Sequence, residues 1–271
     1  MPQLLTWIAL LVPMLITVGS VSADITDDLV VYFTFDKVKG KRVLDASGNG
    51  LDAEVVKNTK FVKGKYGSAV YIRNKTEDCV NVPAVDMLKI SGEITMMAWL
   101  YQKDWLRSSA QWLDKGCYSE KKGSYGMAVF AKKDFPELKL RENDSGIAMI
   151  IAGRNWQRRN IVHYKVESGK WYHITGTHDA ENLKIYLDGE VIGEFDSEFD
   201  FAGTNDEDLR IGCAKGKFGH AFEGGFIDEV ALWSRALSET EIRTAMRGTL
   251  LSVSPKDKVA TTWGNIKRKA F

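Results

Sequence analysis

Three acidic side chains have a spacing that could support glycoside hydrolysis. Glu194, Asp196 and Glu198 form an E-x-D-x-E pattern, which on a strand would point all three acids to one face. A retaining pair needs carboxyl groups about 5–5.5 Å apart, whereas positions i and i+4 of a straight strand lie about 13 Å apart. The series also continues as Phe199-Asp200, as an acidic surface run would. The motif therefore favours a solvated acidic edge over a catalytic strand.

Other catalytic constellations are weaker still. The histidines are His163, His173, His178 and His220. None has the H-E-x-x-H spacing of a zinc peptidase. The chain also contains neither a G-x-S-x-G nucleophile elbow nor a phosphate-binding P-loop. We therefore expect no enzymatic activity.

Aromatic side chains beside polar donors could bind carbohydrate, because a sugar stacks its apolar face on a ring and pairs its hydroxyls with polar groups. The candidates are Trp105, Trp112, Tyr118, Tyr125 and Trp156. Trp156 leads because polar residues flank it on both sides. The predicted ligand site is therefore Trp156 with Arg154, Arg158 and Tyr118. The alternative for Trp156 is a strand-edge residue covered by arginine side chains.

The first 23 residues form a predicted signal peptide. Leu4–Val18 is almost wholly apolar, and Val21-Ser22-Ala23 fits the small-x-small pattern that precedes signal-peptidase cleavage. The segment departs from the usual pattern because no Lys or Arg precedes the apolar run. That run is also shorter than the ~20 residues of a membrane span. We expect cleavage after Ala23, export to the periplasm, the cell surface or the medium, and no membrane span in the mature chain.

Export permits disulfides, and the chain has three cysteines, so at most one internal pair can form. Cys117 and Cys213 each follow a glycine where a strand should end, whereas Cys79 lies inside a strand-like run. We predict a Cys117–Cys213 disulfide, and the alternative is three separate thiols. Zinc binding is disfavoured because no cysteine has a second one at the short spacing of zinc sites.

From Asp28 onward, short apolar or alternating runs recur between turn signals, as in a chain of many short strands. The predicted strands are residues 29–35, 53–56, 69–72, 80–82, 93–101, 111–114, 126–131, 146–152, 160–166, 171–179, 182–187, 190–194, 208–212 and 222–233. No helical spacing separates them, which predicts antiparallel sheets packed as a sandwich. Trp99, Trp171 and Trp233 occupy apolar strand positions and are predicted to lie in the core.

One helix is predicted after the last strand. Ser238 can cap its first turn while Glu241 reaches back to the cap, and Leu237 can pack onto Ile242. Gly248 suits the left-handed position that ends a helix. The sequence therefore predicts a short helix at the end of the domain.

The net charge of +1 gives no global field that would attract nucleic acid or a membrane. Positive charge is concentrated in the C-terminal extension, residues 248–271. Its basic residues are Lys256, Lys258, Lys267, Arg268 and Lys269. We interpret this extension as a solvated basic tail and expect no nucleic-acid partner.

Six segments, in order along the chain, carry a family resemblance. They are Leu29–Asp36, Leu44–Ala53, Gly64–Val70, Thr95–Leu100, Trp171–Glu190 and Phe226–Ile242. Together they closely resemble the LamG-like jellyroll domains of the concanavalin A-like lectin/glucanase superfamily. The resemblance implies an all-β, two-sheet antiparallel jellyroll sandwich with one short C-terminal helix, in a single domain over residues 24–247. It also implies that the E-x-D-x-E motif lies at a rim crossover instead of the catalytic strand.

The resemblance further implies a calcium site. Many jellyrolls of this superfamily hold the ion between the first strand, the turn after it and the last strand. The matching oxygens belong to Asp36, Asn49 and Asp228, and calcium takes about six to eight such ligands. The alternatives are ordinary roles, with Asp36 and Asn49 as turn formers and Asp228 as a buried acceptor for loop amides.

These features predict an exported, non-catalytic binding module that recognises carbohydrate or another extracellular polymer through its concave face and rim loops. A structural calcium ion is the one cofactor expected. The alternative is a protein-interaction or adhesive domain without glycan binding, and a glycoside hydrolase is the third choice. The fold alone does not decide among them.

Overall fold

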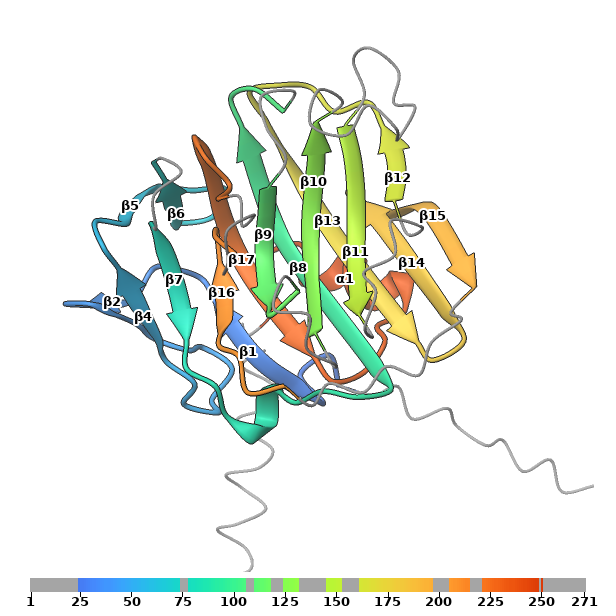
Figure 1. The fold of residues 1–271 in the computed structure, drawn as a ribbon, viewed down its shortest axis with the longest axis horizontal. Coiled ribbons are helices and arrows are strands. Elements are labelled where there is room, and N and C mark those ends of the chain that lie inside the picture. Colours follow the sequence, from blue (N-terminus) through green and yellow to red (C-terminus); the bar gives the residue numbers. More distant parts are fainter. Residues whose placement is uncertain are drawn as a thin grey trace, which may run out of the picture.

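The computed structural model of the chain describes residues 24–73, 78–105, 110–117, 124–131, 145–152, 161–196, 205–214, 221–248 and 250. These residues form two antiparallel sheets that face each other, with one short helix against the outer side of one sheet (Figure 1). The predicted all-β sandwich with a short C-terminal helix is confirmed. The predicted signal peptide and almost all of the C-terminal extension lie outside the described residues.

The two sheets have eight and nine strands. The first contains β1 (Leu29–Phe33), β5 (Lys60–Lys63), β6 (Ser68–Ile72), β8 (Glu93–Gln102), β13 (Lys170–Asp179), β14 (Asn182–Leu187), β15 (Glu190–Asp196) and β17 (Gly225–Trp233). Their order is β15-β14-β13-β8-β17-β6-β5, and β1 also pairs with β17.

The nine-stranded sheet contains β2 (Val38–Lys39), β3 (Arg42–Val43), β4 (Ala53–Val56), β7 (Cys79–Val82), β9 (Ala110–Lys115), β10 (Ser124–Ala131), β11 (Ser145–Ala152), β12 (Ile161–Tyr164) and β16 (Leu209–Ile211). Their order is β12-β11-β10-β9-β16-β7-β4-β3-β2. A 3₁₀ turn, η1 (Asp86–Leu88), precedes β8.

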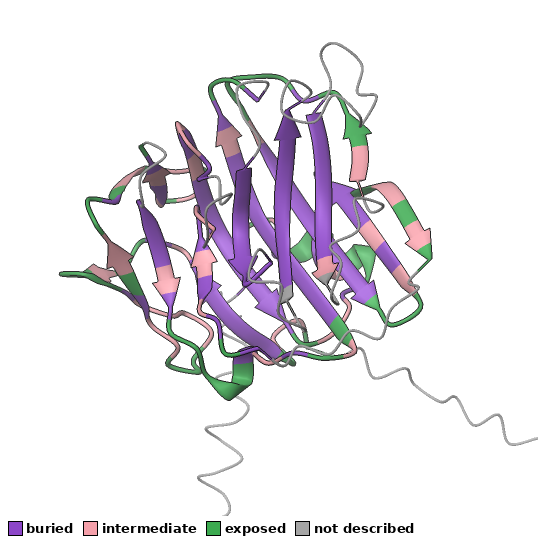
Figure 2. Ribbon diagram, viewed as in Figure 1, coloured by how far each residue is buried: buried purple, intermediate pink, exposed green. Residues whose placement is uncertain are grey.

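The core between the sheets follows from the alternation of side chains along each strand. On β8, Ala98 and Leu100 point between the sheets, whereas Met97 packs on the outer side with the helix. Central strands are buried along most of their length, and exposure rises toward the edge strands β2, β12 and β15 (Figure 2). Both outer faces are therefore made by the alternate residues of strands whose other side is core.

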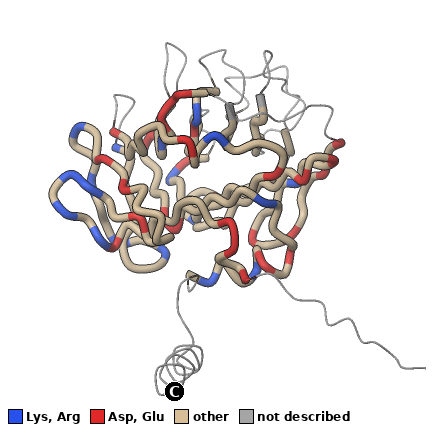
Figure 3. Tube along the Cα trace, turned by 90° about the horizontal axis from the view of Figure 1, so that it is seen from below, with Lys and Arg blue, Asp and Glu red and all other residues tan. Residues whose placement is uncertain are grey.

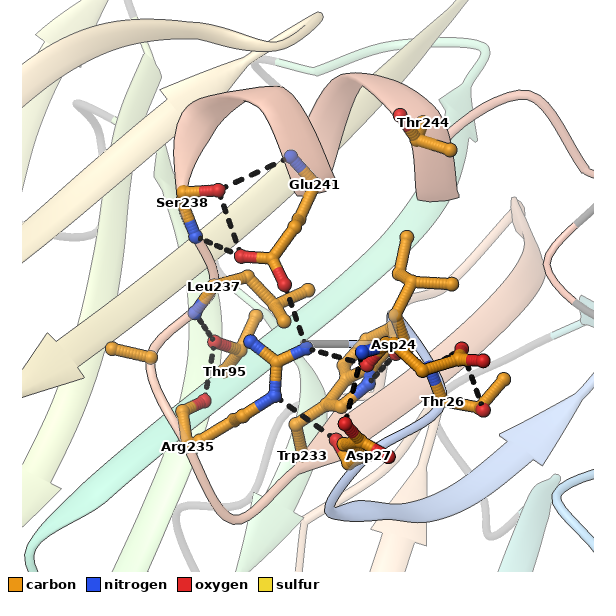
Figure 4. A network of polar contacts seen from close by, with 12 residues as sticks. Asp24, Thr26, Asp27, Thr95, Trp233, Arg235, Leu237, Ser238, Glu241 and Thr244 are labelled. Carbon is orange, nitrogen blue, oxygen red and sulfur yellow. Dashed lines mark hydrogen bonds and ion pairs between the residues drawn. The ribbon is translucent and has the colours of Figure 1, made fainter. Parts of the chain in front are cut away.

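Helix α1 (Glu239–Ala245) covers part of the outer face of the eight-stranded sheet. It begins with the predicted capping box, in which Ser238 Oγ accepts from Glu241 N and Glu241 Oε2 accepts from Ser238 N (Figure 4). Leu237 and Ile242 are buried in the cluster beneath it. Gly248 has φ +68°, as expected of a residue that ends a helix.

Arg235 ties the start of the described chain to this helix. Its guanidinium donates to the carbonyls of Asp24 and Asp27 and forms an ion pair with Glu241 (Figure 4). Trp233 Nε1 donates to the carbonyl of Ile25 at 2.8 Å. Segments about 210 residues apart in sequence are thereby joined.

Among the residues that the structure describes, no helix is long and apolar enough to cross a membrane.

The disulfide joins Cys79 to Cys213, so the predicted Cys117–Cys213 pair is wrong. Cys117 is a buried free thiol. The reason is that β16 lies between β7 and β9 and runs antiparallel to both. Cys213 follows the C-terminal end of β16 and so lies near the start of β7, where Cys79 is. Cys117 follows the C-terminal end of β9, which lies beside the start of β16 and therefore at the other end of these strands.

This assignment predicts that the protein unfolded without reductant exposes one reactive thiol, that of Cys117. Cys79→Ser should lower the free energy of unfolding by about 2–5 kcal/mol because the cross-link constrains the unfolded chain. Cys117→Ser should leave the disulfide intact. Thiol titration and mass spectrometry of an unreduced tryptic digest measure both, and a peptide that links Cys117 to Cys213 would contradict the assignment.

Candidate functional site

A row of polar side chains crosses the outer face of the nine-stranded sheet. Its members, called here the polar row, are Glu54 on β4, Asn81 on β7, Arg210 on β16 and Asp114 on β9. They are register partners in turn along this path. Their neighbours on each strand point into the core, which forces the polar residues onto the opposite face.

The polar row is held in place by Asp208, the residue before β16. Asn81 Nδ2 donates to Asp208 Oδ2 at 3.1 Å, and Arg210 Nη2 lies 3.6 Å from the same oxygen. Asp208 Oδ1 accepts from Ala84 N, and Asp114 Oδ1 accepts from Cys117 N. The Asp208 carboxylate thus holds both Asn81 and Arg210 in fixed positions.

Two polar atoms of this face, Asn81 Oδ1 and Arg210 Nη1, are buried without a hydrogen-bond partner. Gln111 lies on the same face of β9, beside the Cys117 thiol. A buried polar atom without a partner costs about 1–3 kcal/mol. The Asn81 and Arg210 side chains as a whole are partly exposed, so a ligand on this face could contact both residues.

Small residues continue this face beyond β9. Asp114 pairs with Gly126, and Gln111 pairs with Ala128, which pairs with Ala148. A Cβ at Gly126 would lie 2.5 Å from the carbonyl oxygen of Leu113, so a larger residue does not fit there. Farther along the same face, Phe130 and Ile150 form a buried apolar cluster with Ala128 and Ala148, so the polar row borders an apolar part of the sheet.

The predicted ligand residues Trp156, Arg154, Arg158 and Tyr118 lie outside the described residues. The strands that precede them are described. Strands β9 and β11 both pair antiparallel with β10 and so run in the same direction. Their C-terminal ends therefore lie at the same end of the sandwich. The chain reaches Tyr118 shortly after one of these ends and Arg154 shortly after the other.

A second candidate surface is a row of aromatic side chains on the outer face of the eight-stranded sheet. This aromatic row consists of Tyr71, Phe226, Tyr101 and Trp171, which are register partners across β6, β17, β8 and β13. Neighbouring ring centroids lie 4.9, 5.3 and 5.5 Å apart, and all four side chains are partly exposed. Tyr101 and Phe226 pack edge to face, so the rings do not form one flat platform.

The other aromatic expectations have mixed outcomes. Trp99 and Trp233 are buried as predicted, but Trp171 is partly exposed in the aromatic row. Trp105, Trp112 and Tyr125 are buried in the core between the sheets and are therefore wrong as candidates for a surface platform. Trp112 and Tyr125 lie on the buried strands β9 and β10, and Trp105, which follows β8, packs edge to face against Tyr172 and Phe222.

The oxygens predicted to bind calcium do not all converge. Asp36 and Asp228 both approach the turn between β5 and β6, where Asp36 Oδ1 accepts from Ser68 N and Asp228 Oδ2 accepts from Tyr66 N. Asn49 Nδ2 instead donates to the carbonyls of Leu29 and Val30 at the start of β1. A five-residue strand spans about 13 Å, so Asn49 is held at the opposite end of β1 from Asp36.

These contacts match the alternative roles of turn former and buried acceptor. The turn also needs its glycines, since a Cβ at Gly67 would lie 2.0 Å from Asp36 Oδ1 and one at Gly64 2.4 Å from Asp228 Oδ2. Within the described ranges, no group of three or more His, Cys, Asp or Glu side chains is arranged to hold a metal ion. The predicted ligand set therefore does not fit calcium as a unit.

The carboxyl groups of Asp228 and Glu229 are both buried beside this turn. A bulge in β17 follows Asp228, and Glu229 has φ +53°. Glu229 Oε2 accepts a short hydrogen bond from the Tyr32 hydroxyl. Burial raises the pKa of Asp228 to about 8 and the pKa of Glu229 to about 7. The bulge thus brings two consecutive acids into the protein interior.

The acidic E-x-D-x-E motif begins on an edge strand. Glu194 and Asp196 lie on β15, the outermost strand of the eight-stranded sheet. The Glu194 side chain is 53% exposed and pairs with Lys184 at 2.9 Å, as a solvated edge would. Glu198 lies outside the described residues.

Two of the histidines are fixed in structural positions. His173 is fully buried against Trp99, and burial lowers the pKa of its imidazole to about 3. His178 Nδ1 lies 2.7 Å from the carbonyl oxygen of Gly92. His163 lies on β12, and His220 is outside the described residues.

Exposed basic residues gather at the end of the molecule formed by β2–β5 (Figure 3). They include Lys39, Lys41, Lys57 and Lys60. The polar row reaches this end at Glu54. Positive charge therefore borders one end of the candidate surface.

Comparison with known protein families identifies the superfamily of the chain. Residues 74–243 match the Laminin_G_3 family of the concanavalin A-like lectin/glucanases superfamily. The chain belongs to this superfamily. The predicted resemblance is thereby confirmed, and a comparison with curated protein sequences gives no match.

Solved structures of similar fold include both binding domains and parts of enzymes. Domain 4 of AbnA, an extracellular arabinanase from Geobacillus stearothermophilus in complex with arabinotriose, has a TM-score of 0.59 and 14% identity, with 80% of this chain and 98% of that one covered. The binding domain of Paraclostridial Mosquitocidal Protein 1 has a TM-score of 0.58 and 15% identity, with 81% and 52% covered. The chain thus spans about half the length of that toxin domain.

A sialidase from Trypanosoma rangeli is a third structure of similar fold. Its TM-score is 0.56 at 16% identity, with 83% of this chain and 33% of that one covered. Identities this low show a shared fold and leave the function to be argued from the site.

The buried carboxyl of Glu229 predicts a pH-dependent stability. Its pKa is higher in the folded than in the unfolded protein, so its contribution is complete at low pH and is lost as pH rises through about 7. In Glu229→Gln this loss disappears. We compare the unfolding free energy of the variant with that of the wild type at each pH. Between pH 5 and pH 8, this difference should shift by at least about 1 kcal/mol in favour of the variant.

Urea unfolding at the two pH values measures this gain, and the comparison with wild type cancels the contributions of groups that do not interact with Glu229. The charge of Glu229 also raises the pKa of Asp228, so its removal changes the stability in the same direction. The matched control is Glu194→Gln, because Glu194 is exposed on β15. A wild-type protein and a Glu229→Gln variant whose stabilities change in parallel with pH would contradict the prediction.

Proposed function

We propose that the chain is an exported, non-catalytic module that binds carbohydrate through the outer face of the nine-stranded sheet. The observation that carries the proposal is the polar row, in which the partly exposed side chains of Asn81 and Arg210 lie side by side on one face. Amide and guanidinium groups pair well with sugar hydroxyls, which both donate and accept hydrogen bonds. The disulfide is consistent with export, since disulfides persist in oxidising compartments.

Nucleic acid does not suit this face. The polar row contains Glu54 and Asp114, and Asp208 supports it, so carboxylates outnumber the single guanidinium of Arg210. Phosphate recognition would need an excess of Lys and Arg instead. A neutral, hydroxyl-rich polymer fits the mixed polarity better.

A protein-interaction or adhesive domain is the second candidate function. The aromatic row favours it, because a partly exposed cluster of rings is typical of protein interfaces. The edge-to-face packing of Tyr101 and Phe226 suits a flat sugar chain less well. The two functions therefore assign binding to opposite faces of the sandwich.

A glycan array followed by titration calorimetry distinguishes the two faces. Arg210→Ala should weaken glycan binding at least about tenfold, since hydrogen bonds to charged groups contribute about 1.5–3 kcal/mol. Asn81→Ala should weaken it less. Trp171→Ala, on the aromatic row, and Arg247→Ala, just after α1, should change it little. Loss of binding in Trp171→Ala alone would move the site to the aromatic row, and an array without hits would reject carbohydrate binding.

The predicted contribution of Trp156 needs a test of its own. If its ring stacks on the ligand, Trp156→Ala should weaken glycan binding by about ten- to a hundredfold, as alanine substitutions at stacking aromatics do. Trp156→Phe should retain part of the affinity. Unchanged affinity in Trp156→Ala would remove this residue from the site and leave the polar row as the site.

The same assays address calcium and catalysis. Repeating the array with chelator tests the calcium ion expected from the sequence, whose loss would lower the affinity or the melting temperature. Unchanged values would agree with a predicted ligand set that does not converge. Incubation with β-glucans tests the proposal that the protein is not an enzyme. Hydrolysis that disappears in Glu194→Gln would overturn it.

A further inference from the structure

Lys115 is a lysine enclosed in the protein, with 1% of its surface exposed. It lies at the end of β9, one residue beyond Asp114 of the polar row. Its ammonium donates three hydrogen bonds, to Asn205 O at 3.0 Å, Asn205 Oδ1 at 2.8 Å and Glu207 O at 2.7 Å. An ammonium has three donors, so Nζ is fully satisfied by the segment 205–207.

Further hydrogen bonds connect the residues around this ammonium to one another. Asn205 Nδ2 donates back to the carbonyl of Lys115, and Asn205 Oδ1 also accepts from Glu207 N. Burial lowers the pKa of Lys115 to about 8, which leaves the group mostly charged at neutral pH. Backbone and amide oxygens that converge on one cation are also the ligand chemistry of a calcium site.

The segment that the ammonium organises leads directly into the polar row. Residues 205–208 precede β16, a strand of only three residues that carries Arg210. Asp208 bonds Asn81 and lies beside Arg210. The other end of β16 is fixed by the Cys79–Cys213 disulfide. Strand β16 is therefore fastened by a covalent bond at one end and by a buried cation at the other.

We propose that the Lys115 ammonium is a built-in cation, which organises segment 205–208 as a bound metal ion would and thereby positions Asp208 and Arg210 on the binding face. This part of the face then needs no divalent metal. The positioning of a ligand site rests on the proposed function, whereas the role as internal cation is tested without any ligand.

Chemical rescue tests the role directly. Lys115→Ala removes three methylene groups and the ammonium, a space that n-propylammonium fills. We expect the variant to unfold roughly 5–10 °C below the wild type. Added n-propylammonium should restore at least half of this loss, whereas n-propanol, which has nearly the same volume without the charge, should not. Equal rescue by n-propanol, or rescue by neither compound, would overturn the proposal.

A second variant covers the case in which Lys115→Ala does not fold. Lys115→Met keeps the packing of the side-chain stem and removes the charge, and it should lose hydrogen-exchange protection at amides 205–211. Retained protection would overturn the proposal. The matched control is Lys89→Met, which breaks the partly exposed Lys89–Asp206 ion pair and should shift unfolding by less than roughly 2 °C.

Hydrogen exchange on the wild type separates this role from a metal requirement. Treatment with EDTA should leave protection at amides 205–211 unchanged, and a loss confined to these amides would contradict a metal-independent segment. None of these measurements uses a glycan. Rescue without any array hit would thus keep the internal cation and reject the proposed function, and an array hit without rescue would do the reverse.

Discussion

Both sheets depend on strands that come late in the chain. Strand β17 lies between β8 and β6 and also pairs with β1, and β16 lies between β9 and β7. Until these strands are in place, each sheet is two separate groups of strands. Long-range pairing of this kind is entropically costly, which explains why further contacts reinforce it. The Cys79–Cys213 disulfide fastens β16, and the hydrogen bonds of Trp233, at the end of β17, and of Arg235, just after it, fasten this part of the chain to the first described residues.

The polar row is a direct consequence of this insertion. Asn81 and Asp114 lie on strands that do not pair with each other, and only β16 between them places Arg210 within reach of both. A strand of three residues buries little apolar surface of its own, so its position must be determined by its ends. The covalent bond at Cys213 fixes one end of β16, and the oxygens around Lys115 Nζ fix the segment that leads into the other end. Stability and the geometry of the binding face therefore have the same origin.

The sequence was sufficient for the sandwich, the capping box and the family, because these depend on local alternation and on short motifs such as Ser238 with Glu241. It failed where the answer depended on which strands become neighbours. The Cys117 pairing was wrong because strand order decides which strand ends meet. Strands β2, β3 and β5 were not predicted, since two are only two residues long and β5 begins and ends with lysine. A single polar residue between buried ones, as at Asn81 and Arg210, was the available signal for the polar row.

The two outer faces of the sandwich differ in what already covers them. On the eight-stranded sheet, α1 and the cluster around Trp233 occupy one part of the outer face, and the aromatic row remains near the opposite ends of β8 and β13. Those rings pack against one another in stacked, tilted and edge-to-face pairs, so they need no ligand. The polar row is different, because Asp208 fixes the partly exposed amide of Asn81 and guanidinium of Arg210, and both groups can pair with the hydroxyl groups of a ligand. Fixed polar groups, more than exposed apolar area, make the nine-stranded sheet the stronger candidate for recognition.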